Sequence, residues 1–353
     1  MYKKFLMGIA AMAALTLVSC SSDDLNSLSD NSSKNEAISF DGYLGRSAVA
    51  VNGSRGSVLD KTTLPAEGFG VFGNYSSTET ENATFGFNLF NNVKVTGETS
   101  AGGTKWTYSP LKYWQTVGHV DFLAYAPHVD NKQLKGSSID FTVEDKAVNQ
   151  KDLLYAKAVG QTKDNISGTD YKVKFQFAHA LSRLGYTVKL NSDYSNVTIK
   201  LNKITLAGSN DGKGTNKAFY KKGTIDLSYT STTSPTTKLW TPSEEKQDFE
   251  WYSGDKQLSK TTAVENPVTE YLFVIPQNFS ETASDQLYVI VEYTITYSDQ
   301  TTVKTKVYKQ LEKEFLQGKA YTINLTIGLT PIEFNAEVNN WDESDKNYDI
   351  TWN

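Results

Sequence analysis

The chain reads LYVIVEYTITYSDQTTVKTKV from Leu287 to Val307, and this stretch decides the fold. Large apolar or β-branched residues stand at every second position in both halves of the stretch. Such alternation is typical of a strand with one buried face. The polar triplet Ser298-Asp299-Gln300 between the halves indicates a turn. The stretch therefore predicts a β-hairpin.

The same alternation recurs along the chain, whereas helical periodicity is nearly absent. Further strands are indicated at Ile38–Leu44, Val120–Phe122, Tyr171–Phe177, Tyr321–Leu329 and Ile332–Val338. A strand with one apolar face needs a second sheet to cover it, so the economical arrangement is a β-sandwich. The sequence therefore predicts an all-β fold.

Length and composition indicate a globular protein of two domains. The 353 residues are 39% hydrophobic and 12% aromatic, which is enough to build two cores. Loop residues between Gln161 and Gly168 suggest a boundary there, giving domains at 37–168 and 169–353. A boundary as late as Asn191 stays open.

The N-terminus has the pattern of a bacterial lipoprotein signal peptide. Lys3 and Lys4 precede an apolar run from Phe5 to Val18, which is shorter than a membrane span. Leu17-Val18-Ser19-Cys20 then has the order of a lipobox, in which small residues precede the cysteine that carries the lipid. We therefore expect residues 1–19 to be removed and Cys20 to be lipidated.

Cys20 is the only cysteine, so no disulfide can form once it is acylated. Asp23 and Asp24 follow it closely and resemble a signal for display on the outer face of the outer membrane. The polar residues 20–36 predict a flexible tether. We expect a surface lipoprotein held in the outer membrane by its lipid.

The sequence offers little catalytic chemistry. His119, His128 and His179 lack metal-ligand spacing, and no nucleophile elbow or phosphate loop occurs. The acidic group at 342–345 is better explained as a solvated turn than as a calcium site. The net charge of −5 argues against a nucleic-acid partner. We expect neither an enzyme nor a cofactor.

Aromatic residues raise an alternative function. The chain has six tryptophans and 20 tyrosines, and aromatic platforms bind sugars. A monomeric surface lipoprotein that binds glycans through exposed residues such as Trp240 or Trp251 is therefore the competing hypothesis. The same aromatic residues also fill β-sandwich cores.

Four motifs in order resemble the fimbrillin superfamily, the lipoprotein pilins of type V pili. They are Leu111-Lys112-Tyr113-Trp114 with Val120–Pro127, Asp152–Ala156 with Val173–Leu184, Phe273–Gln277, and Gly318–Tyr321. The resemblance implies two tandem transthyretin-like β-sandwich domains. It also implies a precursor whose first strand is removed by a protease, so that a strand from a neighbouring subunit can fill the groove.

The resemblance assigns roles to residues near the N-terminus. Ile38, Phe40 and Leu44 are the candidate core-facing residues of the removable strand. Arg46 follows directly and is the preferred cleavage site, with Arg55 as the alternative. The third arginine is Arg183, so two of three arginines lie in this segment.

The donor strand is expected at the C-terminus, where Tyr348, Ile350 and Trp352 alternate with polar residues. Other pilin subunits would then be the partners, as a homopolymer or with related fimbrillins. A terminal strand that stays on its own domain is the alternative, and it would place the subunit at the tip or the base. A tip adhesin could bind a host protein or a glycan.

Overall fold

The computed structural model describes residues 37–44, 58–78, 83–166, 171–230, 238–267, 269–280, 284–329 and, for the backbone alone, 333–340. Strands dominate these residues, which confirms the all-β prediction. In this described part of the chain, no helix is long and apolar enough to cross a membrane.

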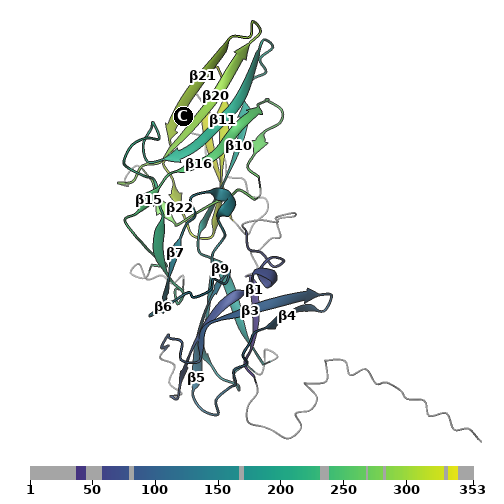
Figure 1. Ribbon diagram of the computed structural model, residues 1–353, viewed down its shortest axis with the longest axis vertical. Coiled ribbons are helices and arrows are strands. Elements are labelled where there is room, and N and C mark those ends of the chain that lie inside the picture. Colours follow the sequence, from purple (N-terminus) through teal and green to yellow (C-terminus); the bar gives the residue numbers. More distant parts are fainter. Residues whose placement is uncertain are drawn as a thin grey trace, which may run out of the picture. The chain divides into compact units, whose positions relative to one another are not determined.

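A seven-stranded sheet is built mainly from the N-terminal half (Figure 1). In spatial order it contains β1 (Ser39–Leu44), β9 (Lys172–His179), β8 (Leu154–Gln161), β5 (His119–Ala126), β2 (Phe69–Ser76), β3 (Phe90–Ser100) and β4 (Gly103–Thr107). β1 is an edge strand and runs parallel to β9.

β5 is buried on both faces because two hydrophobic clusters meet across it. Phe122 and Ala124 belong to a cluster with β1, β3 and β9, which we call the N-terminal core. Leu123 and Tyr125 belong to the cluster that continues into the C-terminal sheets. The alternation at Val120–Phe122 therefore gives way to a continuous apolar run.

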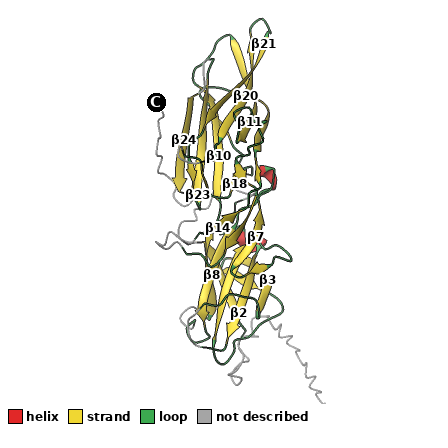
Figure 2. Cartoon of the chain, turned by 90° about the vertical axis from the view of Figure 1, so that its left-hand side faces the viewer, coloured by secondary structure: helices red, strands yellow, loops and turns green. Residues whose placement is uncertain are grey.

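Two sheets of the C-terminal half pack as layers over one core (Figure 2). The first contains β17 (Val264–Glu265), β10 (Ser182–Leu190), β23 (Lys319–Ile327) and β24 (Glu333–Asn340), and β18 (Leu272–Val274) also pairs with β10. The second contains β16 (Phe249–Gln257), β11 (Val197–Ala207), β20 (Tyr288–Tyr297) and β21 (Thr302–Gln310). β20 and β21 form the predicted hairpin.

Smaller elements complete the described structure. A four-stranded sheet joins β14 (Trp240–Pro242), β13 (Lys222–Asp226), β7 (Ser138–Thr142) and β6 (Leu134–Lys135). The short pairs are β12 (Phe219–Tyr220) with β15 (Lys246–Gln247) and β19 (Gln277–Asn278) with β22 (Glu314–Phe315). Single turns of helix occur at α1 (Leu64–Glu67) and at the 3₁₀ segment Ala147–Asn149.

The sheets do not change at the expected domain boundary. β9 begins after residue 168, yet it pairs with β1 and β8 of the N-terminal sheet. The next strand, β10, belongs to a C-terminal sheet, and β7 of the N-terminal half pairs with β13 of the C-terminal half. The division into two domains stays a prediction, and a boundary at 168/169 would separate β9 from its sheet.

Candidate functional site

The predicted removable strand is β1, and it closes one edge of the N-terminal sheet. Six residues of β1 pair with β9, from Ser39 with Lys172 to Leu44 with Phe177. On its other side, just before β1 begins, the Ile38 amide donates to the Lys112 carbonyl at 2.8 Å. Most of the bonding along β1 therefore goes to one neighbour.

The Tyr108 side chain adds a further contact to the same end of β1. Its hydroxyl donates to the Ile38 carbonyl at 2.6 Å. Burial raises the pKa of Tyr108 above its usual value, so the hydroxyl stays protonated and able to donate at neutral pH. This bond fixes the backbone where β1 enters the sheet.

The inward side chains of β1 complete an aromatic core. Ile38 and Phe40 are only 1% and 2% exposed, and Leu44 is half-buried against the same cluster. The Phe40 ring lies 5.4 to 5.6 Å from four other rings, those of Phe90, Tyr108, Phe122 and Phe175. Edge-on and offset pairs at this spacing stabilise a core beyond the area they bury. Removing β1 would expose these rings to water.

β9 depends on β1 for most of its pairing. Its ladder with β8 consists of Leu154 with His179 and Tyr155 with Ala178, both at the end of β9. The preceding residues, Lys172–Phe177, have β1 as their ladder partner. Loss of β1 would therefore leave this part of β9 with unpaired backbone groups, which is the condition for accepting another strand.

Several predicted site residues lie outside the described residues. They are the lipidation site Cys20, the cleavage candidates Arg46 and Arg55, and the donor residues Tyr348, Ile350 and Trp352. The structure therefore describes β1 and its neighbours but neither the cut nor the donor.

The third arginine, Arg183, is built into the fold. It lies in β10, between Phe273 of β18 and Ala320 of β23. Its guanidinium carbon stands 4.6 Å from the centre of the Tyr271 ring. Burial lowers the pKa of Arg183, and the electrostatic influence of Tyr271 and Asp152 offsets part of this lowering. A protease that needs an extended, accessible chain cannot reach this bond in the folded protein.

The histidines form structural contacts in this fold. His179 Nδ1 lies 2.7 Å from the fully buried carboxylate of Asp152, which also accepts a bond from the Leu59 amide. His119 bonds Asp121 and the Thr78 carbonyl. Within the described ranges, no group of His, Cys, Asp or Glu is arranged to hold a metal ion.

The tryptophans named for glycan binding are not exposed, so that part of the prediction is wrong. Trp240 and Trp251 are 6% and 3% exposed. The Trp240 indole donates to the Ala180 carbonyl at 2.8 Å, and Trp251 packs edge-on against Tyr186 at 5.0 Å. Both fill the core that joins the sheets.

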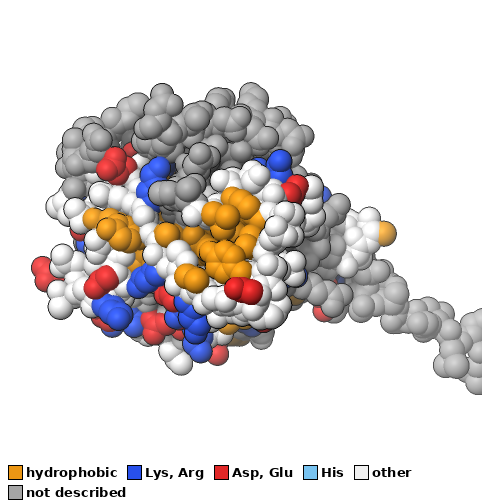
Figure 3. Space-filling view, turned by 90° about the horizontal axis from the view of Figure 1, so that it is seen from above, with side chains coloured by type: hydrophobic (Ala, Val, Ile, Leu, Met, Phe, Trp, Pro, Cys, Tyr) orange, Lys and Arg blue, Asp and Glu red, His pale blue; other side chains and the backbone are white. Residues whose placement is uncertain are grey.

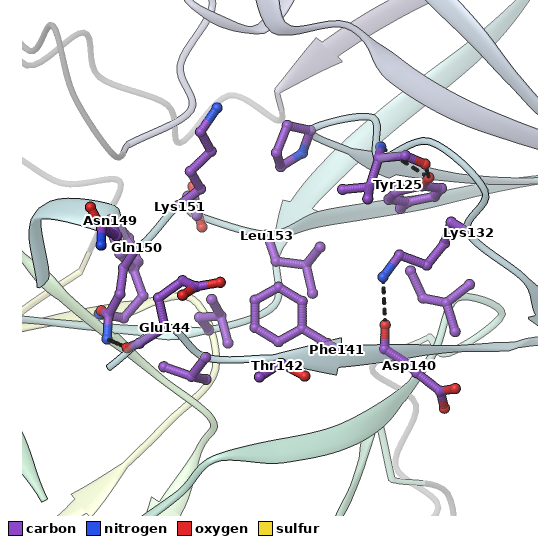
Figure 4. Close-up of a pocket in the computed structure, with 17 residues that line it drawn as sticks. Tyr125, Lys132, Asp140, Phe141, Thr142, Glu144, Asn149, Gln150, Lys151 and Leu153 are labelled. Atoms are coloured by element: carbon purple, nitrogen blue, oxygen red, sulfur yellow. Dashed lines mark hydrogen bonds between the residues drawn. The ribbon is translucent and has the colours of Figure 1, made fainter. Parts of the chain in front are cut away.

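A pocket of about 470 Å³ lies beside β7 (Figure 4). Tyr125, Phe141 and Leu153 form its apolar middle, and Lys132 closes one side by donating to the Asp140 carbonyl at 2.9 Å. Its volume is in the range of small-molecule sites. Polar and charged side chains, among them Glu144, Asn149 and Lys151, share the lining with the apolar ones.

A second exposed feature lies at the end of the molecule where the β20–β21 hairpin is found. Figure 3 looks onto this end and shows hydrophobic side chains gathered there. Tyr297 of β20, Val303 of β21 and Leu329 after β23 are exposed apolar residues of these elements. Among the described residues, no strand covers this surface, whereas β1 covers the rings of the N-terminal core.

Comparisons with known proteins match most of the chain. A family model described as fimbrillin-like matches residues 58–341, a range that begins after β1. A fimbrial protein from Bacteroides vulgatus has a similar structure, with a TM-score of 0.65 and 20% identity over 86% of this chain and 99% of that chain. This similarity shows a shared fold.

Weaker similarities have TM-scores below 0.5. One is to a putative cell adhesion protein from Bacteroides uniformis, with a TM-score of 0.49 and 17% identity over 86% of this chain and 98% of that chain. Another is to the fimbrial anchor protein Mfa2 from Porphyromonas gingivalis, with a TM-score of 0.36 and 12% identity over 87% and 98% of the two chains. Among curated proteins, none matches the chain significantly.

Proposed function

Since the chain belongs to the fimbrillin-like family, we propose that it is a structural subunit of an extracellular fimbria used for adhesion. The precursor is exported as a lipoprotein, acylated at Cys20 and held at the surface of the outer membrane. The mature subunit is a link in the fibre, and its partners are other pilin subunits.

The position and packing of β1 support this proposal. β1 is an edge strand that, with Ile38 just before it, supplies the almost completely buried Ile38 and Phe40 side chains to the N-terminal core, and it has six residues paired with β9. Thirteen residues, 45–57, separate Leu44 from the next described residue, Val58. A single cut in this stretch would leave β1 attached to the rest of the chain by non-covalent contacts alone.

Strand exchange follows from the energetics of that edge. With β1 gone, the backbone groups of β9 and the rings around Phe40 would face water, and both exposures are unfavourable. A strand from a neighbouring subunit restores the backbone pairing and the core in one step. Because the contact is head-to-tail and does not close, the product is an unbranched fibre.

Proteolysis at Arg46, or alternatively at Arg55, is the proposed trigger. An arginine-specific protease has three candidate bonds in the chain, and the one at Arg183 lies within a strand that is paired on both sides. The cut is therefore directed to the segment after β1. The donor is the C-terminal segment with Tyr348, Ile350 and Trp352; if it stays on its own domain, the subunit sits at the tip or base instead.

Treatment of the purified precursor with an arginine-specific protease tests the proposal. Mass spectrometry should show a new N-terminus at Ser47, or at Gly56 if Arg55 is cut, with no product from Arg183. The processed protein should then form ladders that resist mild denaturant.

The matched control is the double variant Arg46→Lys and Arg55→Lys, which keeps the charge and should remain uncut and monomeric. A processed wild-type protein that stays monomeric at high concentration would contradict polymerisation by strand exchange. Cleavage at Arg183 in the folded protein would contradict the assignment of the trigger.

A further inference from the structure

Gly42 interrupts the row of large inward side chains on β1. It stands between Phe40 and Leu44 on the face that meets the N-terminal core. A Cβ atom at this position would lie 3.0 Å from Phe69 Cε1, 3.3 Å from Phe177 Cε2 and 3.5 Å from Trp106 Cζ2. The space that a side chain would need is therefore taken by three rings from other strands.

These rings have little freedom to move aside. Phe69 is fully buried, and its ring lies 5.0 Å from that of Trp106 and 5.3 Å from that of Phe177. Phe177 in turn lies 6.0 Å from Phe175, which stacks on Phe40. A displacement at the level of Gly42 would therefore disturb the packing at the level of Phe40 as well.

The groove beneath β1 thus has two unlike parts. It is deep at the levels of Ile38 and Phe40, where large side chains are almost completely buried. It is closed at the level of Gly42, where the rings reach the backbone. This profile belongs to the walls of the groove and persists when the strand is replaced.

We propose that the groove selects its replacement strand by size at the level of Gly42. The occupant is an extended strand with large apolar residues at the levels of Ile38 and Phe40 and with glycine, or no inward side chain, two residues further on. The inference rests on the proposed function, since it describes which strand can take the place of β1.

The rule also bears on the chain's own C-terminal candidate. Tyr348, Ile350 and Trp352 are all large, so none of them fits at the level of Gly42. A donor segment that carries them must therefore place a residue without a large inward side chain at that level.

Peptide exchange into the processed protein tests this selection. The full chain is cut with an arginine-specific protease, and a labelled synthetic peptide of residues 37–45 displaces the β1 fragment, followed by fluorescence anisotropy. The same peptide with Gly42→Val should bind at least about tenfold more weakly, because overpacking a close-packed site is unfavourable. The matched control peptide, Tyr43→Val, changes an outward, exposed residue and should bind within about threefold of the original.

A compensating change in the protein separates size selection from a general loss of strand propensity. Phe69→Leu removes the Cε1 atom nearest to Gly42, so it should bring the Gly42→Val peptide to within about threefold of the unchanged peptide. Equal binding of both peptides to the unchanged protein would overturn the selection rule while leaving strand exchange intact. Failure of every peptide, the unchanged one included, would overturn strand exchange itself.

Discussion

β1 and β21 are both edge strands, but the fold holds them in opposite ways. β21 follows β20 after a short turn and pairs with it from Thr302 to Gln310. Its side chains contribute little to a core, since Val303 and Tyr308 are 44% and 54% exposed. β1 pairs with a partner that is distant in the sequence, and its Phe40 side chain is almost completely buried while Leu44 is half-buried.

The difference shows what makes a strand replaceable. The hairpin holds β21 by local backbone pairing, so cutting the chain elsewhere does not release it. β1 is held by buried apolar surface, which any strand with a suitable pattern can supply. Of these two edge strands, the one that contributes to a core is therefore the one that we propose another strand can replace.

The largest expected effect is a loss of stability when the buried ring of β1 is removed. Phe40→Ala should lower the free energy of unfolding by about 3–5 kcal/mol, because it removes a buried ring and leaves a cavity among four others. Chemical denaturation of the purified protein measures this loss. This value has two parts: the free energy of transferring the ring from water to the core, which the variant loses, and the free energy of the cavity that is left.

Tyr308→Ala on β21 is the matched change of an aromatic residue on the other edge strand. It should alter the free energy of unfolding by no more than about 1 kcal/mol, because the ring is exposed and contacts mainly Tyr288. Similar losses for the two variants would remove the distinction between the strands.

Hydrogen exchange sharpens the same distinction at the backbone. When β1 is displaced from the processed protein, those amides of Lys172–Phe177 that point toward β1 should lose protection by at least about tenfold, because β1 is their ladder partner. Amides of Tyr288–Tyr297 in β20 lie between two other strands and should keep theirs. Unchanged protection in β9 would mean that β9 holds its place without β1.

Local alternation in the sequence was enough to predict the fold class and several strands. β20, β9 and β23 follow it because each has one buried and one wetter face. β21 alternates only between half-buried and exposed residues. β5 does not follow it, because both of its faces are covered. Pairing between distant strands, such as β7 with β13, has no local signature, so the sequence pattern did not predict which strands share a sheet.

The sequence predicted the site about as completely as it predicted the fold. Alternation identified Ile38, Phe40 and Leu44 as the inward residues of β1, and the structure buries the first two almost completely. Gly42 gave no signal, because its importance comes from Phe69, Phe177 and Trp106 on other strands. Trp240 was misjudged for a related reason, since its burial depends on sheets that meet only in the folded chain.

A smaller effect is expected where Tyr108 holds the start of β1. Tyr108→Phe should lower the free energy of unfolding by about 0.5–1.5 kcal/mol, because the Ile38 carbonyl loses its hydroxyl donor. The pKa of Tyr108 is raised in the folded state, so the bond contributes fully below the ordinary phenol pKa of about 10. This contribution is lost as the pH rises through the higher folded value.

The difference in stability between wild type and Tyr108→Phe should therefore shrink above pH 10. Denaturation of both proteins at neutral and at alkaline pH measures it. Other buried tyrosines titrate in the same range in both proteins, so the comparison between the two isolates Tyr108. A difference that grows with pH would contradict the role assigned to the hydroxyl.

The smallest expected change in stability concerns two lysines of β21. Lys304 and Lys306 lie on this exposed edge strand, and lysines on an edge oppose pairing with another chain. Lys304→Thr with Lys306→Thr should change the free energy of unfolding by less than about 1 kcal/mol but cause self-association at high concentration, seen by light scattering. Lys189→Thr on β10, an exposed lysine on a strand that is not at an edge, should leave the protein monomeric. If the β21 variant also stays monomeric, the lysines do not protect this edge from pairing with another chain.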